Sequence, residues 1–450
     1  MQPRTLLSVG VAFTMGLSAI QAQAKVSAEE AAKLGAELTP VGAEKAANAD
    51  GSIPEWTGGE PQSGDPSGMW PDETKYVPEQ SIATITKANM AEYADKLTEG
   101  HKAMLERYDT YKMLVYKSHR PVSYPAPIVK ATKENATRAF LDGDPDHIKG
   151  AKLGFPFPIP QSGAEVIWNH RLRWRGEAVK RYNNQAIVQP SGEYQISKLV
   201  EDVKFPYTDL DDPQPFDEED DIAIYYLSET IAPPRNAGQF LLGWEHPYSR
   251  SAWLYNPGLR RVRRAPNVGF DNPYEGTDGN QFYDQVDMYN GSFERYTWKL
   301  VGKKEVYIPY NSHNINLPKH KYDDIIQQYH VNQDIARYEL HRVWVVEAEL
   351  KPGTSHSFKK RRFYVDEDSW YVTAVDCYDN RDELWKFQEA HTAYTTNVQA
   401  VGGAPELIYD FQTGGYFATA MINEDKPNDF SVEYNDKYFT TQNVKKLTTR

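Results

Sequence analysis

The sequence predicts a β-rich α+β fold, in which one large curved antiparallel sheet packs on helices and carries an extended helical and loop-rich N-terminal portion. Three observations predict this fold. Aromatic residues make up 13% of the 450 residues, apolar and polar residues alternate from about residue 221 onward, and short turns join the strand-like runs. Short turns favour antiparallel pairing, because parallel strands need long crossover connections. The aromatic content also excludes a disordered chain.

The first 24 residues have the architecture of a secretory signal peptide. Arg4 supplies the positive charge, residues 6–20 are almost wholly apolar, and Ala22 and Ala24 form an A-x-A cleavage site. We expect cleavage after Ala24. The alternative is a membrane anchor, but the apolar run is shorter than the ~20 residues that a spanning helix needs. The lone cysteine, Cys377, excludes a disulfide scaffold and is expected to be buried.

Residues 25–150 are expected to form a helical and loop-rich region packed on the main domain. Ser27 and Glu30 make a capping box for a helix running to about Leu38. Residues 48–54 indicate a turn, and the following stretch to about residue 78 is loop-like. Residues 89–117 have helical spacing, with a break expected at Gly100.

Residues 151–450 are expected to form the antiparallel β-rich main domain, so that 25–450 make one structural unit. A capping box at Ser162 and Glu165 predicts an amphipathic helix. Alternation then predicts a strand over 221–228, a hairpin of 251–255 and 259–264, and a pair of 297–301 and 303–308 turning near Gly302. Further strands are expected over 343–350, 361–365, 370–375 and 384–394.

No motif for catalysis stands out. The sequence has no Gly-x-Ser-x-Gly elbow, no His-Glu-x-x-His, no phosphate loop and no dinucleotide fingerprint. We therefore expect no cofactor and no metal site, and we assign no catalytic residue. The net charge of −13 argues against a nucleic-acid partner, which would require a basic face. The acidic segment 209–221 could hold calcium or be a solvated loop, and the sequence leaves that choice open.

Two features are candidates for ligand binding. Arg261 and Arg263 share one face of a predicted strand, where they could attract an anionic ligand or lipid head group. The alternative is pairing with the chain's own carboxylates, or protection of an edge strand by charge. The second feature is an aromatic and proline-rich loop, with Phe155 and Phe157, that runs into a helix with Trp168 and Trp174. These rings could form a lid over a cavity, or they could be ordinary core.

Several sequence segments, which follow one another in a fixed order, resemble those of a known protein family. Together they span essentially the whole mature chain. They are 48–59 (NADGSIPEWTGG), 154–160 (GFPFPIP) with 165–170 (EVIWNH), 260–266 (RRVRRAP), 298–304 (WKLVGKK) with 307–310 (YIPY), 341–347 (HRVWVVE) and 361–370 (RRFYVDEDSW). With these strings the chain resembles an exported bacterial family known as domain of unknown function 1329. That family is in turn similar to the LolA/LolB-like lipoprotein carriers and is often described as outer-membrane lipoprotein-sorting.

The resemblance implies an incomplete antiparallel barrel wrapped over helices around an apolar cavity, in a periplasmic protein of Gram-negative bacteria. It also implies a resistance-nodulation-type exporter and an outer-membrane protein as partners. No catalytic residue can be carried over from it. The residue directly after the expected cleavage site is Lys25 and not a cysteine, so we expect no lipid anchor.

These observations lead to one leading hypothesis and two alternatives. The leading hypothesis is a soluble periplasmic carrier or chaperone that binds a lipid, lipoprotein or other hydrophobic molecule in a half-barrel cavity. The alternatives are a periplasmic hydrolase of a glycan or lipid with paired carboxylates, and a ligand-free accessory protein of an envelope complex. The character of the cavity distinguishes them. An enclosed apolar pocket favours carriage, a polar cleft with two close carboxylates, at least one of them with a raised pKa, favours hydrolysis, and a filled core without a pocket favours the accessory role.

Overall fold

The computed structural model describes residues 26–68, 70, 75–76, 79–247, 249–265 and 270–449. The expected signal peptide and its cleavage site lie outside these residues. The helices are α1 (Ala28–Ala31), α2 (Glu99–Arg107), α3 (Ala126–Arg138), α4 (Gly163–Arg171), α5 (Tyr322–Ile325) and α6 (Thr441–Leu447). The first strands are β1 (Ala83–Ile85), β2 (Met113–Tyr116), β3 (Phe140–Leu141), β4 (Ile148–Lys149), β5 (Ala178–Tyr182), β6 (Asn184–Val188), β7 (Tyr194–Lys204), β8 (Ile224–Ala232) and β9 (Phe240–Glu245). The others are β10 (Arg250–Asn256), β11 (Arg261–Arg264), β12 (Tyr296–Pro309), β13 (Tyr338–Leu350), β14 (Lys360–Asp366), β15 (Val372–Tyr378), β16 (Leu384–Thr395), β17 (Ala400–Asp410) and β18 (Tyr416–Met421).

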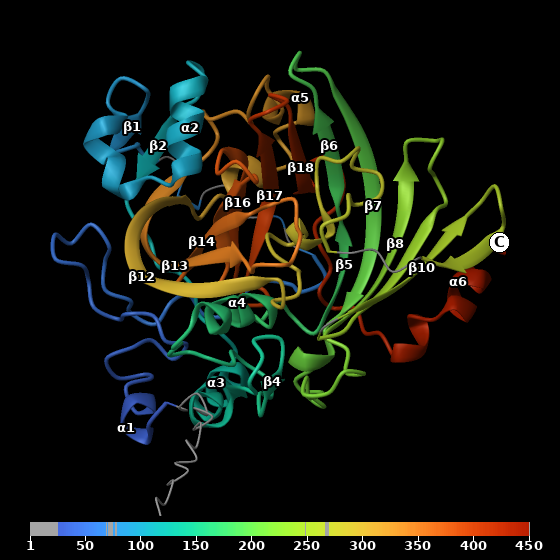
Figure 1. Ribbon diagram of the computed structural model, residues 1–450, viewed down its shortest axis with the longest axis horizontal. Coiled ribbons are helices and arrows are strands. Elements are labelled where there is room, and N and C mark those ends of the chain that lie inside the picture. The colour runs from blue at the N-terminus through green and yellow to red at the C-terminus, as the bar shows by residue number, and fades with distance from the viewer. Residues whose placement is uncertain are drawn as a thin grey trace, which may run out of the picture.

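All strands except the short β3–β4 pair join one 16-stranded sheet. Its order is β1-β2-β13-β14-β15-β16-β17-β18-β6-β7-β8-β9-β10-β11, with β12 beside β13 and β5 beside β7. Every pairing is antiparallel except that of β13 with β2. The sheet curves without closing, as Figure 1 shows, so the predicted fold class is confirmed.

The sheet divides into a main part and a wing at the long strand β7. The first half of β7 pairs with β6 in the main part, and its second half pairs with β5. The wing continues through β8, β9, β10 and β11 and splays away from the main part on the right of Figure 1. The bend between β5 and β6 falls at Asn183.

One large hydrophobic cluster fills the interior of the main part. Helix α4 packs against β12, β13 and β14 inside the curve, and α2 packs against β15 and β16. The wing has a smaller cluster of its own, in which Leu227, Phe240 and Leu242 contact Phe439 and Val444 of the C-terminal segment. That segment, ending in α6, covers one face of the wing. The other face of the wing turns toward the main part.

Three local predictions differ from the structure. The helix after Ser27 keeps its capping box but ends at Ala31, and Gly35 then has φ +84°. Residues 90–96 form a 3-10 helix, the break precedes Glu99, and 113–116 form a strand. Gly100 lies inside α2, where a Cβ atom would come within 2.0 Å of the Phe387 ring. This glycine allows close packing rather than breaking the helix.

Two further predictions are corrected by burial and by a bulge. Helix α4 begins after Ser162 as predicted, but it is buried on all sides from Gly163 to His170 and is not amphipathic. Residues 296–309 form the single strand β12, because Gly302 (φ +124°) makes a bulge opposite β13 instead of a turn. The predicted hairpins at β10–β11 and β14–β15 are present, and Cys377 is buried.

None of the helices in the described part of the chain combines the length and the apolar character needed to span a bilayer. The prediction that residues 25–450 form one structural unit stays a prediction.

Candidate functional site

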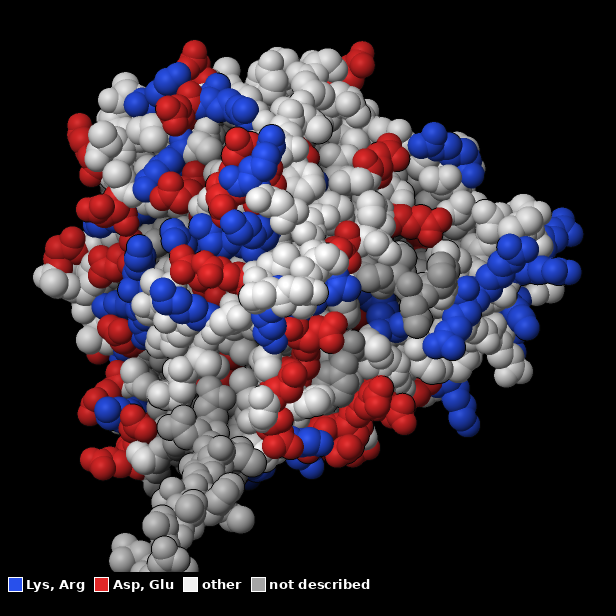
Figure 2. Space-filling model, in the orientation of Figure 1, with Lys and Arg blue, Asp and Glu red and all other residues white. Residues whose placement is uncertain are grey.

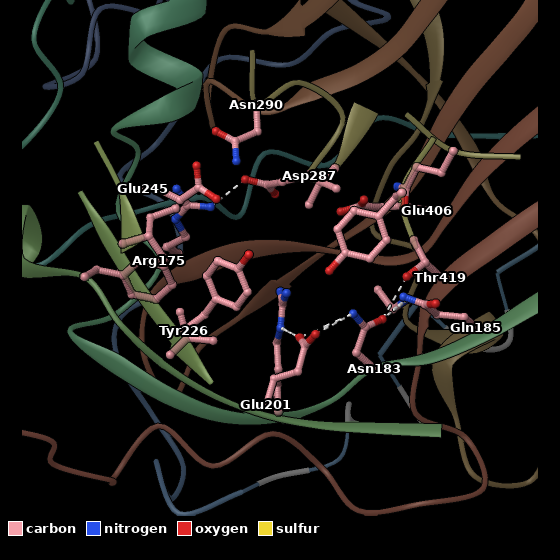
Figure 3. Close-up of a pocket in the computed structure, with 18 of the residues that line it drawn as sticks. Arg175, Asn183, Gln185, Glu201, Tyr226, Glu245, Asp287, Asn290, Glu406 and Thr419 are labelled. Atoms are coloured by element: carbon pink, nitrogen blue, oxygen red, sulfur yellow. Dashed lines mark hydrogen bonds and ion pairs between the residues drawn. The ribbon is translucent and has the colours of Figure 1, made fainter. Parts of the chain in front are cut away.

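A polar pocket lies where the wing diverges from the main sheet, as Figure 3 shows. The wing supplies β5, β7, β8, β9 and β10, the main sheet supplies β6, β17 and β18, and residues 274–290 close the third side. The cavity has a volume of about 100 Å³. Its polar and charged walls include Arg175, Arg181, Asn183, Gln185, Glu201, Tyr226, Glu245, Arg250, Tyr274, Asp287, Asn290, Glu406 and Thr419.

Alternation along the wing strands explains why these side chains meet. Successive residues of a strand point to opposite faces of the sheet. Val203 pairs with Tyr226, and Tyr226 with Gly243, so these positions share one face with Glu201 and Glu245. That face turns away from α6, whose side is taken by the hydrophobic cluster of the wing. Glu201 and Glu245 are therefore placed on the same inner face of the wing.

Three arginine–carboxylate groups neutralise most of the charge in the pocket. Arg181 Nε donates to Glu201, and Arg250 Nε donates to Glu245. Asp287 accepts from both Arg173 and Arg175. Burial alone would raise the pKa of Asp287, but the two guanidinium groups outweigh it and lower that pKa. Asp287 is therefore ionised.

Glu406 is the carboxyl group of the pocket without an arginine partner among the described residues. Tyr371 Oη donates to its Oε1 at 2.6 Å. Burial, followed by repulsion from Asp287, raises the pKa of Glu406 to about 7. Near neutral pH the group is thus poised between a neutral form that can donate a hydrogen bond and a charged form that cannot.

Several polar groups on the pocket walls keep unused hydrogen-bonding capacity among the described residues. The side-chain amides of Gln185 and Asn290 and the hydroxyls of Tyr226 and Tyr274 have no protein partner there. Arg181 uses its Nε on Glu201, while its two Nη atoms have no partner and 41% of its side chain is exposed. Across the pocket, Asn183 links Glu201 to Thr419, with Thr419 Oγ1 donating to Asn183 Oδ1 at 2.8 Å (Figure 3).

The pocket can hold a small polar group but not a whole lipid. Pockets that enclose a drug-sized ligand measure about 300–1,000 Å³, several times the volume found here. With Glu406 neutral, the four arginines Arg173, Arg175, Arg181 and Arg250 exceed the three paired carboxylates by one positive charge, and ionised Glu406 would cancel it. The site therefore suits a group that both donates and accepts hydrogen bonds and carries at most one negative charge.

The inner face of the wing continues from the pocket to the predicted arginines. Glu201 pairs with Ser228, Ser228 with Leu241, Leu241 with Leu254, and Leu254 with Arg263. No bulge interrupts these pairings, so the five side chains form one row across the face. Leu241 and Leu254 are half-exposed and Arg263 is exposed. Lys and Arg side chains gather over this wing in Figure 2.

Arg261 and Arg263 share the inner face of β11, as predicted, since they pair with Asn256 and Leu254. Neither arginine forms an ion pair with a described residue. They lie at the edge of the sheet, which keeps open both the ligand-binding role and the protection of an edge strand. Their role in ligand binding stays a prediction.

The four predicted aromatic residues do not line the pocket. Phe155 and Trp168 are fully buried, and Phe157 and Trp174 are 6% and 5% exposed. Trp168 stacks on Phe293 with ring centroids 5.0 Å apart, and its Nε1 donates to Pro145 O. These positions match the core alternative, and a role in ligand binding stays a prediction for them too.

In the acidic segment, Asp221 Oδ2 accepts from the backbone N–H groups of Asp217 and Glu218.

Comparison with known proteins identifies the family. Residues 84–445 match the model of a family described as "Protein of unknown function (DUF1329)". The chain belongs to this family. It is 46% identical over 446 residues to "Uncharacterized protein PA3922" of Pseudomonas aeruginosa, with 97% of each chain covered.

Solved structures with a similar fold are more distant. A DUF1329 family protein from Desulfovibrio piger is 15% identical, with 60% of this chain and 92% of that chain covered and a TM-score of 0.40. A putative outer membrane lipoprotein-sorting protein domain from Vibrio parahaemolyticus is also 15% identical, with 63% and 98% covered and a TM-score of 0.43. The LolA superfamily protein NE2245 from Nitrosomonas europaea is 12% identical, with 63% and 100% covered and a TM-score of 0.38.

Sequence reasoning missed the pocket residues because no local pattern marks them. They come from positions between 175 and 420 and meet only through the sheet topology. One signal was available: charged residues at inward strand positions, such as Glu201 in β7 and Glu245 at the end of the apolar strand β9. Buried charges of this kind are expensive unless they are paired, and so they indicate either an ion pair or a site.

Proposed function

We propose that the protein is a periplasmic carrier that binds an amphiphilic molecule, with the head group in the polar pocket and the apolar tail on the inner face of the wing. One observation carries this proposal. A cavity too small for a lipid, lined by unused hydrogen-bonding groups, adjoins a row of half-exposed leucines on the same sheet face. Such a surface suits a ligand with one polar and one apolar end.

The charges of the pocket define the head group. The two Nη atoms of Arg181 have no partner among the described residues and can bind a carboxylate or phosphate in bidentate fashion. Glu406, once ionised, opposes a group with several negative charges. We therefore propose a head group that is uncharged or carries a single negative charge and that has hydroxyl or amide functions for Gln185 and Asn290.

The row on the wing is long enough for an acyl chain. Four strand spacings separate Glu201 from Arg263, which at about 4.8 Å each gives roughly 19 Å. A tail lying there would bury part of its surface against Leu241 and Leu254. At about 0.8 kcal/mol per fully buried CH₂ group, half-burial of eight such groups supplies roughly 3 kcal/mol. This is modest, and it suits a carrier that must release its ligand.

The setting in the cell follows from the resemblance. The expected signal peptide and the resemblance to the family support a periplasmic location for the proposed carrier, with an exporter and an outer-membrane protein as its proposed partners. Handover requires only that a partner compete for the ligand or favour a state that binds it less tightly. No covalent step is needed.

A hydrolase is the second candidate, and Glu406 is the observation that favours it. A carboxyl group with a pKa of about 7 beside an ionised carboxylate is the arrangement expected of a general acid and its partner. However, Glu201, Glu245 and Asp287 are each engaged by arginine. None of these three carboxylates is free to act as a base or nucleophile, so binding accounts for the pocket better.

Binding of a fatty acid with a dansyl group at the far end of its chain tests the proposal. We expect a saturable rise in fluorescence for the wild-type protein and binding weakened by about tenfold in Arg181→Gln, since one charge-assisted contact contributes about 1.5–3 kcal/mol. Arg381→Gln is the matched control, because Arg381 is exposed and distant from the pocket. Equal binding by both variants, or no saturable binding, would reject the carrier. Turnover of acyl esters or glycosides that is lost in Glu406→Gln would favour the hydrolase.

A further inference from the structure

A second cluster of titratable side chains lies apart from the pocket, at the turn between β14 and β15. His341 of β13, Asp366 at the end of β14 and Asp368 in the turn are all buried. One ligand atom from each lies within 4.8 Å of the other two. In the described part of the chain, this is the one group of three such side chains whose ligand atoms all lie within that distance of one another.

The imidazole of His341 is held in one orientation. Its Nε2 lies 3.0 Å from Glu339 Oε2, and Glu339 is itself bound by Arg337 Nε at 2.6 Å. The ring also packs on Tyr310, with centroids 3.9 Å apart. An ionised carboxylate only accepts hydrogen bonds, so Nε2 is the donor in this contact, and Nδ1 is the nitrogen not used by Glu339. A carboxylate behind a histidine in this way is a recurrent support for metal ligands.

Asp366 has one oxygen satisfied and one without a partner. Its Oδ2 accepts from Ser369 N at 2.9 Å, from Ser369 Oγ at 2.5 Å and from Tyr310 Oη at 3.1 Å. Its Oδ1 is buried with no hydrogen-bond partner among the described residues. A buried carboxylate oxygen left in this state costs free energy that a bound cation would offset.

The positive side chains nearby are committed to the other carboxylates of the turn. Arg120 donates Nε and Nη2 to the two oxygens of Asp368 at 2.8 and 2.7 Å. Glu367 pairs with Lys303 and Arg342. Asp366 has no Lys or Arg partner among the described residues. Each carboxylate oxygen has about two lone pairs, so Asp368 keeps acceptor capacity beside its arginine.

A cavity of about 190 Å³ adjoins the cluster on the side of Asp368. Its walls include Val41, Trp56, Val122 and Tyr124, so the N-terminal segment forms part of it. Asp368 is the cluster residue that lines this cavity, and the cavity has space for water beside it.

We propose that His341, Asp366 and Asp368 bind one divalent transition-metal ion. One imidazole nitrogen and two carboxylate oxygens suit Zn²⁺ or Mn²⁺, whereas Ca²⁺ and Mg²⁺ prefer oxygen ligands alone. The three protein ligands leave at least one coordination position for water from the cavity. This site is separate from the polar pocket and does not depend on the proposed carrier function.

Equilibrium dialysis against ZnCl₂ or MnCl₂, with elemental analysis of the protein, tests the site. Asp366→Asn is the informative variant, because the amide oxygen can still accept from Ser369 and Tyr310 while its NH₂ group replaces Oδ1. Asp376→Asn is the matched control: Asp376 is equally buried and accepts from Gly100 N and Tyr364 Oη outside the cluster.

We expect about one bound ion per chain for the wild-type protein and for Asp376→Asn. In Asp366→Asn we expect the affinity for the ion to fall by more than about tenfold, because losing a direct ligand weakens binding more than losing a residue that supports a ligand. Circular dichroism verifies that each variant is folded. If Asp366→Asn does not fold, metal binding is measured for His341→Gln instead. The shift in melting temperature that each ion causes in the wild-type protein is measured as well. Absence of binding of both ions by wild type, or equal binding by a folded cluster variant, would overturn the proposal.

Discussion

Replacement of Glu406 by Gln tests the electrostatics of the pocket quantitatively. The glutamine keeps an oxygen for the hydrogen bond from Tyr371 Oη but cannot ionise. The pKa of Glu406 is raised from 4.5 to about 7 in the folded protein. Between these values the folded protein binds a proton that the unfolded chain has released, so stability falls as the pH rises. The difference corresponds to roughly 2.5 kcal/mol between about pH 5 and about pH 8.

Glu406→Gln lacks this pH-dependent stabilisation. Its free energy of unfolding relative to that of the wild-type protein should therefore rise by roughly 2.5 kcal/mol between about pH 5 and about pH 8. Urea denaturation of both proteins at the two pH values measures it. Below the unfolded-state pKa the two proteins should differ only by the direct effect of the amide. A difference in stability that does not change with pH, or one that changes in the opposite direction, would refute the raised pKa and the isolation of this carboxyl group from the arginines.

Three further predictions concern the core, the N-terminal segment and the ligand. Trp168→Ala should destabilise the protein by about 3–5 kcal/mol in denaturation, as expected for a fully buried tryptophan; unchanged stability with weakened ligand binding would instead support the lid. Gly42→Ala should lower the melting temperature, because a Cβ atom there would lie 1.8 Å from Pro158 O at a φ of +102°; an unchanged value would contradict the packing of residues 25–150 on the main domain. Titration with the dansyl fatty acid should show affinity falling as the pH rises through about 7, as Glu406 gains charge opposite an anionic head group, and Glu406→Gln should abolish that dependence.

The sequence predicted those parts of the fold that are determined by local pattern. The hairpins β10–β11 and β14–β15 could be predicted because turn residues lie between two alternating runs. Helix α4 could be placed from its capping box, but its complete burial could not, since burial on every side depends on β12, β13 and β14. Gly302 was misread because a glycine with positive φ serves a bulge as well as a turn.

Most of the candidate site could not be predicted from the sequence. Its residues approach one another only when β7 pairs with β5, β6 and β8 and the main sheet returns through β17 and β18. That Arg261 and Arg263 share one face could be predicted, because side chains two residues apart on a strand point to the same side. The structure adds that Glu201 and Leu254 lie on this face too. The four aromatic residues were selected for their size, and size alone does not distinguish the core from a cavity wall.

The charge of the pocket is nearly balanced, because arginines and carboxylates lie opposite one another on its walls. Arginine–carboxylate pairs keep the buried charges tolerable, and removal of one partner from such a pair is costly. The unused donors and acceptors of Arg181, Gln185 and Tyr226 remain for a ligand. This division between paired and unpaired polar groups distinguishes the pocket from an ordinary buried ion-pair network.

Native mass spectrometry of protein purified gently from its own cells tests the central claim most directly. The account predicts that the wild-type protein carries a small amphiphile, that Arg181→Gln carries much less of it, and that Arg381→Gln carries as much as wild type. The fragmented ligand should have an uncharged or singly charged polar head and an apolar tail. Wild-type protein that is repeatedly free of any such molecule, or equal occupancy in Arg181→Gln, would contradict the account.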